Sequence, residues 1–172
     1  MLFSIVLLVV LILINAFFAA SEIALISIND NKVRLLAREG NKKALRLQKL
    51  LGEPSRFLAT IQIGITLAGF LASAFAADRF AEPLVALIKR TNIPISEIWL
   101  KNISVIVITV VLSYLTLVLG ELVPKRIGMK KAESISMSVV GPLRVLSVLA
   151  APFVKLLTLS TDGIVRLLGM DP

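Results

Sequence analysis

Residues 102–128 read NISVIVITVVLSYLTLVLGELVPKRIG, and this stretch decides the fold class. Nineteen residues without a charged side chain, 102–120, come directly before Glu121. A helix rises about 1.5 Å per residue, so a run of this length crosses a hydrocarbon core of about 30 Å. The stretch therefore predicts a transmembrane helix that ends on a glycine and a carboxylate.

Two further runs have the same character. Residues 1–21 carry no charged side chain, and neither do the twenty-one residues 57–77. A cleaved signal peptide is the alternative for the first run, but no basic segment precedes its apolar part. The chain of 172 residues is 57% apolar, above the roughly 45–50% usual for soluble domains, and its mean hydropathy is +0.91. We expect an all-α integral membrane protein with three transmembrane helices per chain.

The basic residues predict the orientation of these helices. Eight of the nineteen Lys and Arg lie in residues 32–56, and a second basic cluster follows the third run. Cytoplasmic loops are enriched in such residues. This predicts an N-terminus outside, residues 30–56 inside, 78–101 outside as a short loop that could include a surface helix, and a cytoplasmic C-terminus. The net charge of +8 could also indicate nucleic-acid binding, but its clustering between apolar runs favours a membrane surface.

Two regions outside the apolar runs are predicted to be amphipathic. Residues 31–51 alternate leucines with Lys and Arg, which predicts a pair of interfacial helices broken near Gly40. In the tail, 132–172, Arg144, Lys155 and Arg166 recur every eleven residues and two prolines interrupt the sequence. We expect one or two amphipathic helices along the cytoplasmic interface there, or alternatively a re-entrant segment. The predicted division is a three-span transmembrane domain over 1–150 and an amphipathic tail over 151–172 that leads to a soluble part.

The absence of cysteine and histidine narrows the chemistry. It excludes zinc sites built on thiolate or imidazole, haem and iron–sulfur ligation, and Cys-His or Ser-His catalysis. A metal would have to be bound by oxygen atoms, which favours hard cations such as Mg²⁺. We expect no enzymatic activity.

The end of the third run combines three unusual residues. Pro124 has no N–H, so it cannot donate to the carbonyl of Gly120, as the fourth residue along an α-helix normally does. Glu121 stands beside that carbonyl, and a backbone carbonyl with a carboxylate offers oxygen ligands to a cation. The alternative is that Pro124 ends the helix and that Lys125, four residues on, neutralises Glu121.

Other polar residues lie on helical stripes. Asn15 and Glu22, seven residues apart, fall within about 20° of each other on a helix, whereas Ser21 points elsewhere. The second and third runs each carry small and hydroxyl residues at i, i+4, i+7 and i+11, which predicts that these helices face one another: Gln62, Thr66, Gly69 and Ser73, and Thr109, Ser113, Thr116 and Gly120.

Three segments together resemble a known family: NAFFAASEIAL, TIQIGITLAGFLASAFA and GELVPKRIG look like the transmembrane domain of the CorC/cyclin M family. The resemblance implies Mg²⁺ transport, usually efflux driven by Na⁺ entry, by a homodimer in the cell membrane. It implies that Ser21, Gly120 and Glu121 are ion ligands, together with Asn15 and Thr66. Some relatives carry asparagine where Ile65 and Gly69 stand here, which weakens any assignment of ligands to the second helix.

The resemblance also implies a soluble regulatory part beyond this chain. Longer members of the family continue into paired cystathionine-β-synthase-type domains that bind ATP, so no nucleotide site is assigned to these residues. A different class of function stays open at this point. The chain could be a non-transporting membrane anchor or sensor for a cytoplasmic regulatory module.

Overall fold

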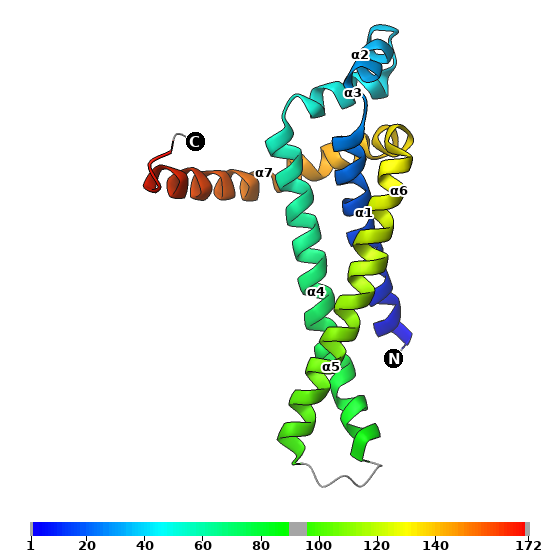
Figure 1. The fold of residues 1–172 in the computed structure, drawn as a ribbon, viewed down its shortest axis with the longest axis vertical. Helices are drawn as coiled ribbons and strands as arrows, with labels where there is room; N and C mark the ends of the chain where they lie inside the picture. The colour runs from blue at the N-terminus through cyan, green and yellow to red at the C-terminus, as the bar shows by residue number, and fades with distance from the viewer. Residues whose placement is uncertain (1, 90–95, 171–172) are drawn as a thin grey trace. The chain divides into compact units, whose positions relative to one another are not determined.

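The computed structural model describes residues 2–89 and 96–170, and within these ranges the chain is helical with no strand. Figure 1 shows the order of the elements along the chain. They are α1 Leu2–Ser27, α2 Asp30–Arg38, α3 Lys42–Leu51, α4 Pro54–Lys89, α5 Glu97–Leu117, the π-helix η1 Val118–Leu122, α6 Val123–Lys130 and α7 Ala132–Leu167.

Among the described residues, four helical stretches are long and apolar enough to cross a membrane: α1, α4, Ile98–Lys130 and α7. The first three contain the predicted transmembrane runs. The fourth, α7, lies in the tail, where one or two amphipathic helices were predicted, and it forms one helix. By length and composition alone it is a candidate in addition to the three expected transmembrane helices. Its charged residues are so widely spaced that an 18-residue window holds at most two Asp, Glu, Lys or Arg, and its two prolines stay inside one helix of 36 residues. Prolines are tolerated in apolar helices whose freed backbone groups find other partners.

The predicted loop after the second run is also corrected. Helix α4 continues through Pro83 to Lys89, so residues 78–89 are helical. Residues 90–95, which include Pro94, lie outside the described residues. The start of α4 at Pro54 agrees with the preference for proline in a first helical turn.

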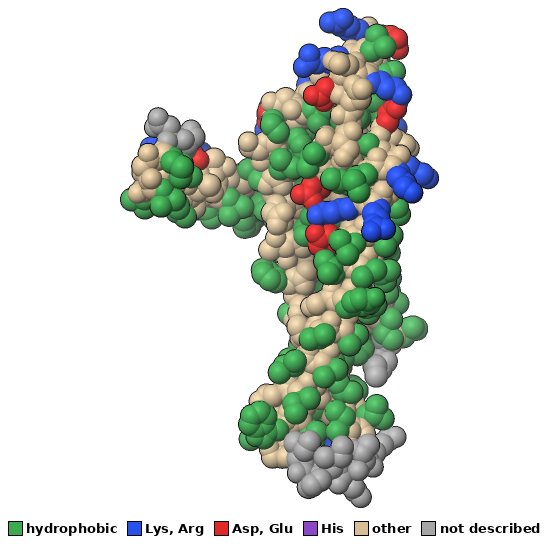
Figure 2. Space-filling model, viewed as in Figure 1, with side chains coloured by type: hydrophobic (Ala, Val, Ile, Leu, Met, Phe, Trp, Pro, Cys, Tyr) green, Lys and Arg blue, Asp and Glu red, His purple; other side chains and the backbone are tan. Residues whose placement is uncertain are grey.

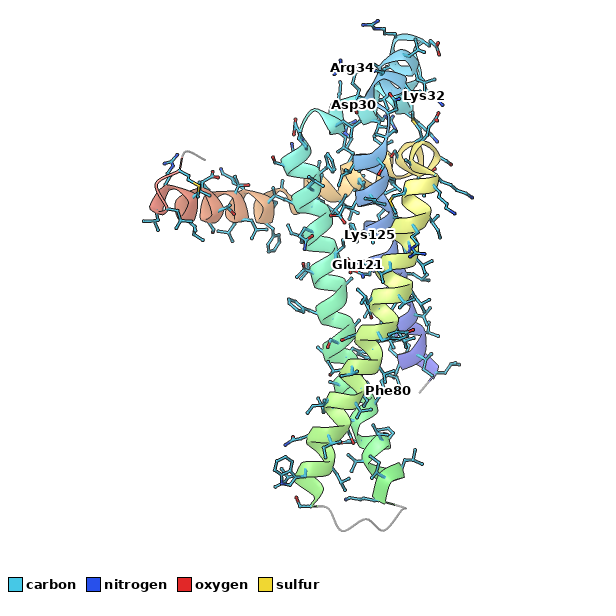
Figure 3. All side chains as sticks on the ribbon, in the orientation of Figure 1. Asp30, Lys32, Arg34, Phe80, Glu121 and Lys125 are labelled. Atoms are coloured by element: carbon cyan, nitrogen blue, oxygen red, sulfur yellow. The ribbon has the colours of Figure 1, made fainter. Side chains whose placement is uncertain are left out.

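The chain divides into two compact units. The first contains α1 up to Ala20 and the segment Gly64–Lys130. One buried cluster of this unit joins Ile12 of α1, Ala72 and Ala76 of α4 and Leu112 of α5. The partly buried residues packed against it are Leu8, Leu11, Phe80 and Ile108, of which Figure 3 labels Phe80. Alanine lets membrane helices approach closely.

The polar stripes therefore do not form the contact between α4 and α5 within one chain. Thr66 and Ser113 are exposed, whereas Ala72, Ala76 and Leu112 are buried. Much of the remaining surface of α5 is apolar, and Figure 2 shows hydrophobic side chains along its visible length. Such a surface suits contact with lipid or with another apolar helix.

The second unit comprises Ser21–Ile63 and the segment from Lys131 onward. In it, α2 and α3 form the predicted amphipathic pair. Gly40 has a φ of +87°, and Asn29 and Asn41 cap α2 and α3 by accepting hydrogen bonds from backbone N–H groups of the first turn. The buried positions are apolar: Val33 and Ala37 in α2, Ala44 and Leu47 in α3. Helix α3 packs against α7, and Lys32 pairs with Glu133 at the start of α7.

Candidate cation site

The helix that carries the GELVP motif does not stop at its proline. Residues Val118–Leu122 form a π-helical turn, with the N–H of Val123 donating to the carbonyl of Val118. The chain then continues as α6 through Pro124 to Lys130. The alternative reading of Pro124 as a helix end is therefore wrong. A π-turn changes the hydrogen-bond register, and such turns occur frequently at functional sites.

The carbonyl of Gly120 has an unusual partner. The side chain of Asn15 in α1 donates to it from Nδ2 at 3.3 Å, and both residues are buried. Pro124 cannot donate to this carbonyl because it lacks an N–H. A carbonyl oxygen has two lone pairs, so this bond leaves acceptor capacity on Gly120.

The other end of the Asn15 amide lacks a partner. The side chain of Asn15 is 3% exposed, and its Oδ1 has no hydrogen bond to any described residue. A buried acceptor without a partner costs about 1–3 kcal/mol, so it needs an explanation such as a bound ion or water. Oδ1 is an uncharged oxygen of the kind that hard cations accept.

Close packing holds the two oxygen-bearing segments together. A Cβ added at Gly120 would lie 3.1 Å from Nδ2 of Asn15 and 3.4 Å from the carbonyl oxygen of Ile12. Glycine at this position therefore lets α1 approach the π-turn.

A second close approach was not predicted. A Cβ at Gly64 of α4 would lie 2.4 Å from Cε2 and Cζ of Phe18, which is buried and stacks edge-on against Phe17 with ring centroids 5.4 Å apart. Phe18 lies one helical turn after Asn15. The contact thus fixes α1 against α4 next to the candidate site. The only sequence signal was a glycine inside an apolar helix.

Glu121 already has a partner. Its Oε1 lies 2.9 Å from Nζ of Lys125, and the two side chains are 33% and 31% exposed (Figure 3). This is the i, i+4 pair that the alternative reading predicted. Ion pairs with this degree of exposure contribute about 0–1 kcal/mol, so a divalent cation could displace the ammonium group at little cost.

No contact within one unit joins the other two predicted ligands, Ser21 and Thr66, to Asn15, Gly120 and Glu121. Ser21 is fully buried and belongs to the second unit, and Thr66 is exposed on α4. Their roles as ligands stay predictions. Among residues 2–89 and 96–170, no group of three acidic side chains is close enough to hold a metal, so Glu121 would supply the charge beside neutral oxygens.

The sequence is similar to a known family and to several bacterial proteins. The sequence model described as the cyclin M transmembrane N-terminal domain matches residues 6–172. The UPF0053 protein sll0260 of Synechocystis is 38% identical over 161 residues, covering 94% of this chain and 36% of its own length. The UPF0053 protein YhdT of Bacillus subtilis is 31% identical, covering 98% and 36%. The UPF0053 inner membrane protein YfjD of Escherichia coli is 29% identical, covering 91% and 33%. The chain thus spans about a third of the length of these relatives.

Proposed function

Because the chain belongs to the cyclin M transmembrane domain family, as its three motifs predicted, we propose that this multi-pass membrane domain transports Mg²⁺. The proposed direction is efflux, coupled to Na⁺ entry across the cell membrane. The transported ion binds beside the π-turn, and it is the substrate of the protein.

One observation carries the proposal: the unpartnered Oδ1 of Asn15 next to the carbonyl of Gly120. The amide nitrogen of Asn15 donates to the carbonyl of Gly120, which Pro124 cannot satisfy, and the amide oxygen of the same buried side chain has no partner among the described residues. Glu121 follows Gly120 in the chain and adds the negative charge. This set is suited to a hard cation and offers nothing to a soft one.

The chemistry of Mg²⁺ fits a small set of protein ligands. Mg²⁺ requires six oxygens at about 2.0–2.1 Å and commonly keeps several of its water molecules. Asn15, Gly120 and Glu121 would supply three, and Ser21 and Thr66 are the proposed further ligands. Binding requires the carboxylate of Glu121 to exchange Lys125 for the metal ion. Release of the ion returns the carboxylate to the ammonium group.

The protein is proposed to act as a homodimer with its N-terminus outside the cell. The exposed polar positions on otherwise apolar helices, such as Thr66 and Ser113, support a second chain as a partner in the membrane. Nucleotide binding would belong to the part of the longer relatives that this chain does not span.

Ion binding and flux test the proposal directly. Glu121→Gln and Asn15→Leu should each weaken Mg²⁺ binding in isothermal titration by at least about tenfold, because even the loss of an outer partner of a metal costs about 10- to 100-fold. Both variants should also lose Mg²⁺ flux in proteoliposomes. The matched control is Glu82→Gln, which removes an exposed carboxylate of α4 and should change neither quantity. Wild-type affinity in a folded Asn15→Leu variant would exclude this site.

The same preparations distinguish the alternatives. A membrane anchor would show no saturable heat with Mg²⁺, and the pair formed by Glu121 and Lys125 is the observation that favours that reading. Coupling is tested by imposing a Na⁺ gradient on the proteoliposomes. Mg²⁺ flux that is indifferent to the gradient would remove Na⁺ from the proposal while leaving the site intact.

A further inference from the structure

A basic groove lies in the second unit, and none of the residues that line it belongs to the candidate cation site. Residues from the end of α3, the start of α4 and the middle of α7 enclose a cavity of about 300 Å³. Four cationic side chains line it, Arg46, Lys49, Arg56 and Arg144, against a single carboxylate, Glu53. A volume of this size is at the lower end of small-molecule sites.

Most of this positive charge is not neutralised within the chain. Arg56 lies 3.2 Å from Glu53, but Arg46, Lys49 and Arg144 have no carboxylate within 4 Å among the described residues. The groove also includes the first turn of α4, where the helix dipole adds partial positive charge. The local electrostatics therefore favour an anion.

The walls of the groove are apolar. Phe57 and Val140 are buried and line it, and Leu50 and Val148 complete its apolar side. Arginine and lysine with apolar side chains beside them suit a ligand with an anionic end and a hydrocarbon part. A soluble phosphate compound would use the cations and leave the apolar wall without a partner.

The groove continues along α7. A second cavity of about 300 Å³ shares Arg56 and adds Lys155, with the hydroxyls of Ser55 and Thr158. Arg144 and Lys155 are eleven residues apart, so they lie within about 20° on the same face of α7 and about 16 Å apart along it. The spacing of these two residues gives each cavity one cation from α7, Arg144 in the first and Lys155 in the second.

We propose that this groove binds the headgroup of an anionic phospholipid. The cations hold the phosphodiester, and the acyl chains run over Phe57 and the exposed apolar side chains of α7 such as Val148 and Leu149. Phospholipid is the occupant that the surroundings favour, because α4 and α7, which form the groove, are both apolar enough to cross a bilayer. Basic pockets beside transmembrane helices are recurrent sites for anionic lipids.

Lipid binding to the purified chain tests this. Phosphatidylglycerol and phosphatidylcholine with identical acyl chains are titrated separately, and bound lipid is counted by native mass spectrometry. The test variant combines Arg46→Gln, Lys49→Gln and Arg144→Gln. The matched control, Lys42→Gln with Lys43→Gln and Lys130→Gln, removes the same charge from exposed positions that line neither cavity.

The expected result is preferential binding of phosphatidylglycerol that falls about tenfold or more in the test variant and less than twofold in the control. An equal fall in both variants would overturn the proposal, since it would mean unspecific attraction to a basic surface. Equal binding of phosphatidylcholine would also overturn it. Inorganic phosphate that binds without lipid and depends on the same three cations would replace the lipid by a soluble anion.

A second pair of variants keeps every charge. Val148 lines the first cavity and is 62% exposed, so Val148→Trp fills the groove. The control is Val145→Trp, which adds the same bulk to α7 at a position that is 61% exposed and lines neither cavity. Phosphatidylglycerol binding should fall several-fold for Val148→Trp alone. Equal binding by the two tryptophan variants would show that the cavity is not the site.

Discussion

Replacing Gly64 by alanine should destabilise the protein, although alanine is the better helix former. The added Cβ would lie 2.4 Å from two ring atoms of Phe18, and carbon atoms normally approach to about 3.5–4.0 Å. The ring or the helix must therefore move by more than about 1 Å. Phe18 is buried, so its ring has no free space to enter, and overpacking of this kind costs about 1–3 kcal/mol.

The steric cost of Gly64→Ala is best measured against the same substitution at a second glycine of α4. Gly69 also lies in α4, and a Cβ there would have nothing within 4 Å. Alanine gains about 0.8–1.0 kcal/mol over glycine in a helix interior, and this gain is common to both variants. The difference between Gly64→Ala and Gly69→Ala therefore isolates the steric cost. For a chain of this size it should separate the midpoints of thermal unfolding by roughly 5 °C.

The assay is thermal unfolding of the detergent-solubilised variants, with Phe18→Leu as a second background. Leucine lacks the Cε2 and Cζ atoms that would lie 2.4 Å from the new Cβ, so in that background the difference between the two alanine variants should become smaller. If Gly64→Ala is as stable as Gly69→Ala with Phe18 present, the close crossing of α1 and α4 is refuted. A difference that persists with Phe18→Leu would mean that another contact causes it.

Three further predictions concern the cation site and the α2–α3 turn. Gly120→Ala should weaken Mg²⁺ binding about tenfold in isothermal titration, because its Cβ would lie 3.1 Å from Nδ2 of Asn15 and displace the amide; unchanged affinity would contradict this. Lys125→Gln should strengthen Mg²⁺ binding by up to about fivefold, because the metal no longer displaces an ammonium group worth about 0–1 kcal/mol from Glu121. A weaker affinity would mean that Lys125 assists binding. Gly40→Ala should cost about 1 kcal/mol, since φ there is +87°, and lower the midpoint of unfolding by about 2–4 °C, whereas Gly52→Ala, at a φ of −70°, should not.

The sequence predicted the local features of the fold and missed those that depend on distant contacts. The break between α2 and α3 was predictable because a glycine and an asparagine determine it locally. The hydrogen bond between Asn15 and Gly120 joins residues 105 apart, and no pattern within either segment specifies it. The residues of the motif were found, but their arrangement was not.

One reading failed because a rule was taken from another setting. Helix termination was one reading of Pro124, because proline removes an α-helical hydrogen bond, but the π-turn before it lets the helix continue. The tail was predicted to contain one or two amphipathic helices because its charge-free runs are short, and it forms one helix. Helix α7 carries isolated Arg and Lys on a long apolar helix, and such side chains can extend their charged ends toward water.

The pairing of Glu121 with Lys125 also has an electrical consequence. When the site holds no ion, the carboxylate of Glu121 and the ammonium group of Lys125 together carry no net charge. Under the proposed function, the membrane voltage would then act on the loaded site and leave the empty one largely unaffected. Moving one charge against 100 mV costs about 2.3 kcal/mol, so expelling a divalent ion from a cell that is negative inside costs about twice that amount. The return of the empty site would be electrically silent, and the current carried in each cycle would be that of the transported ions alone.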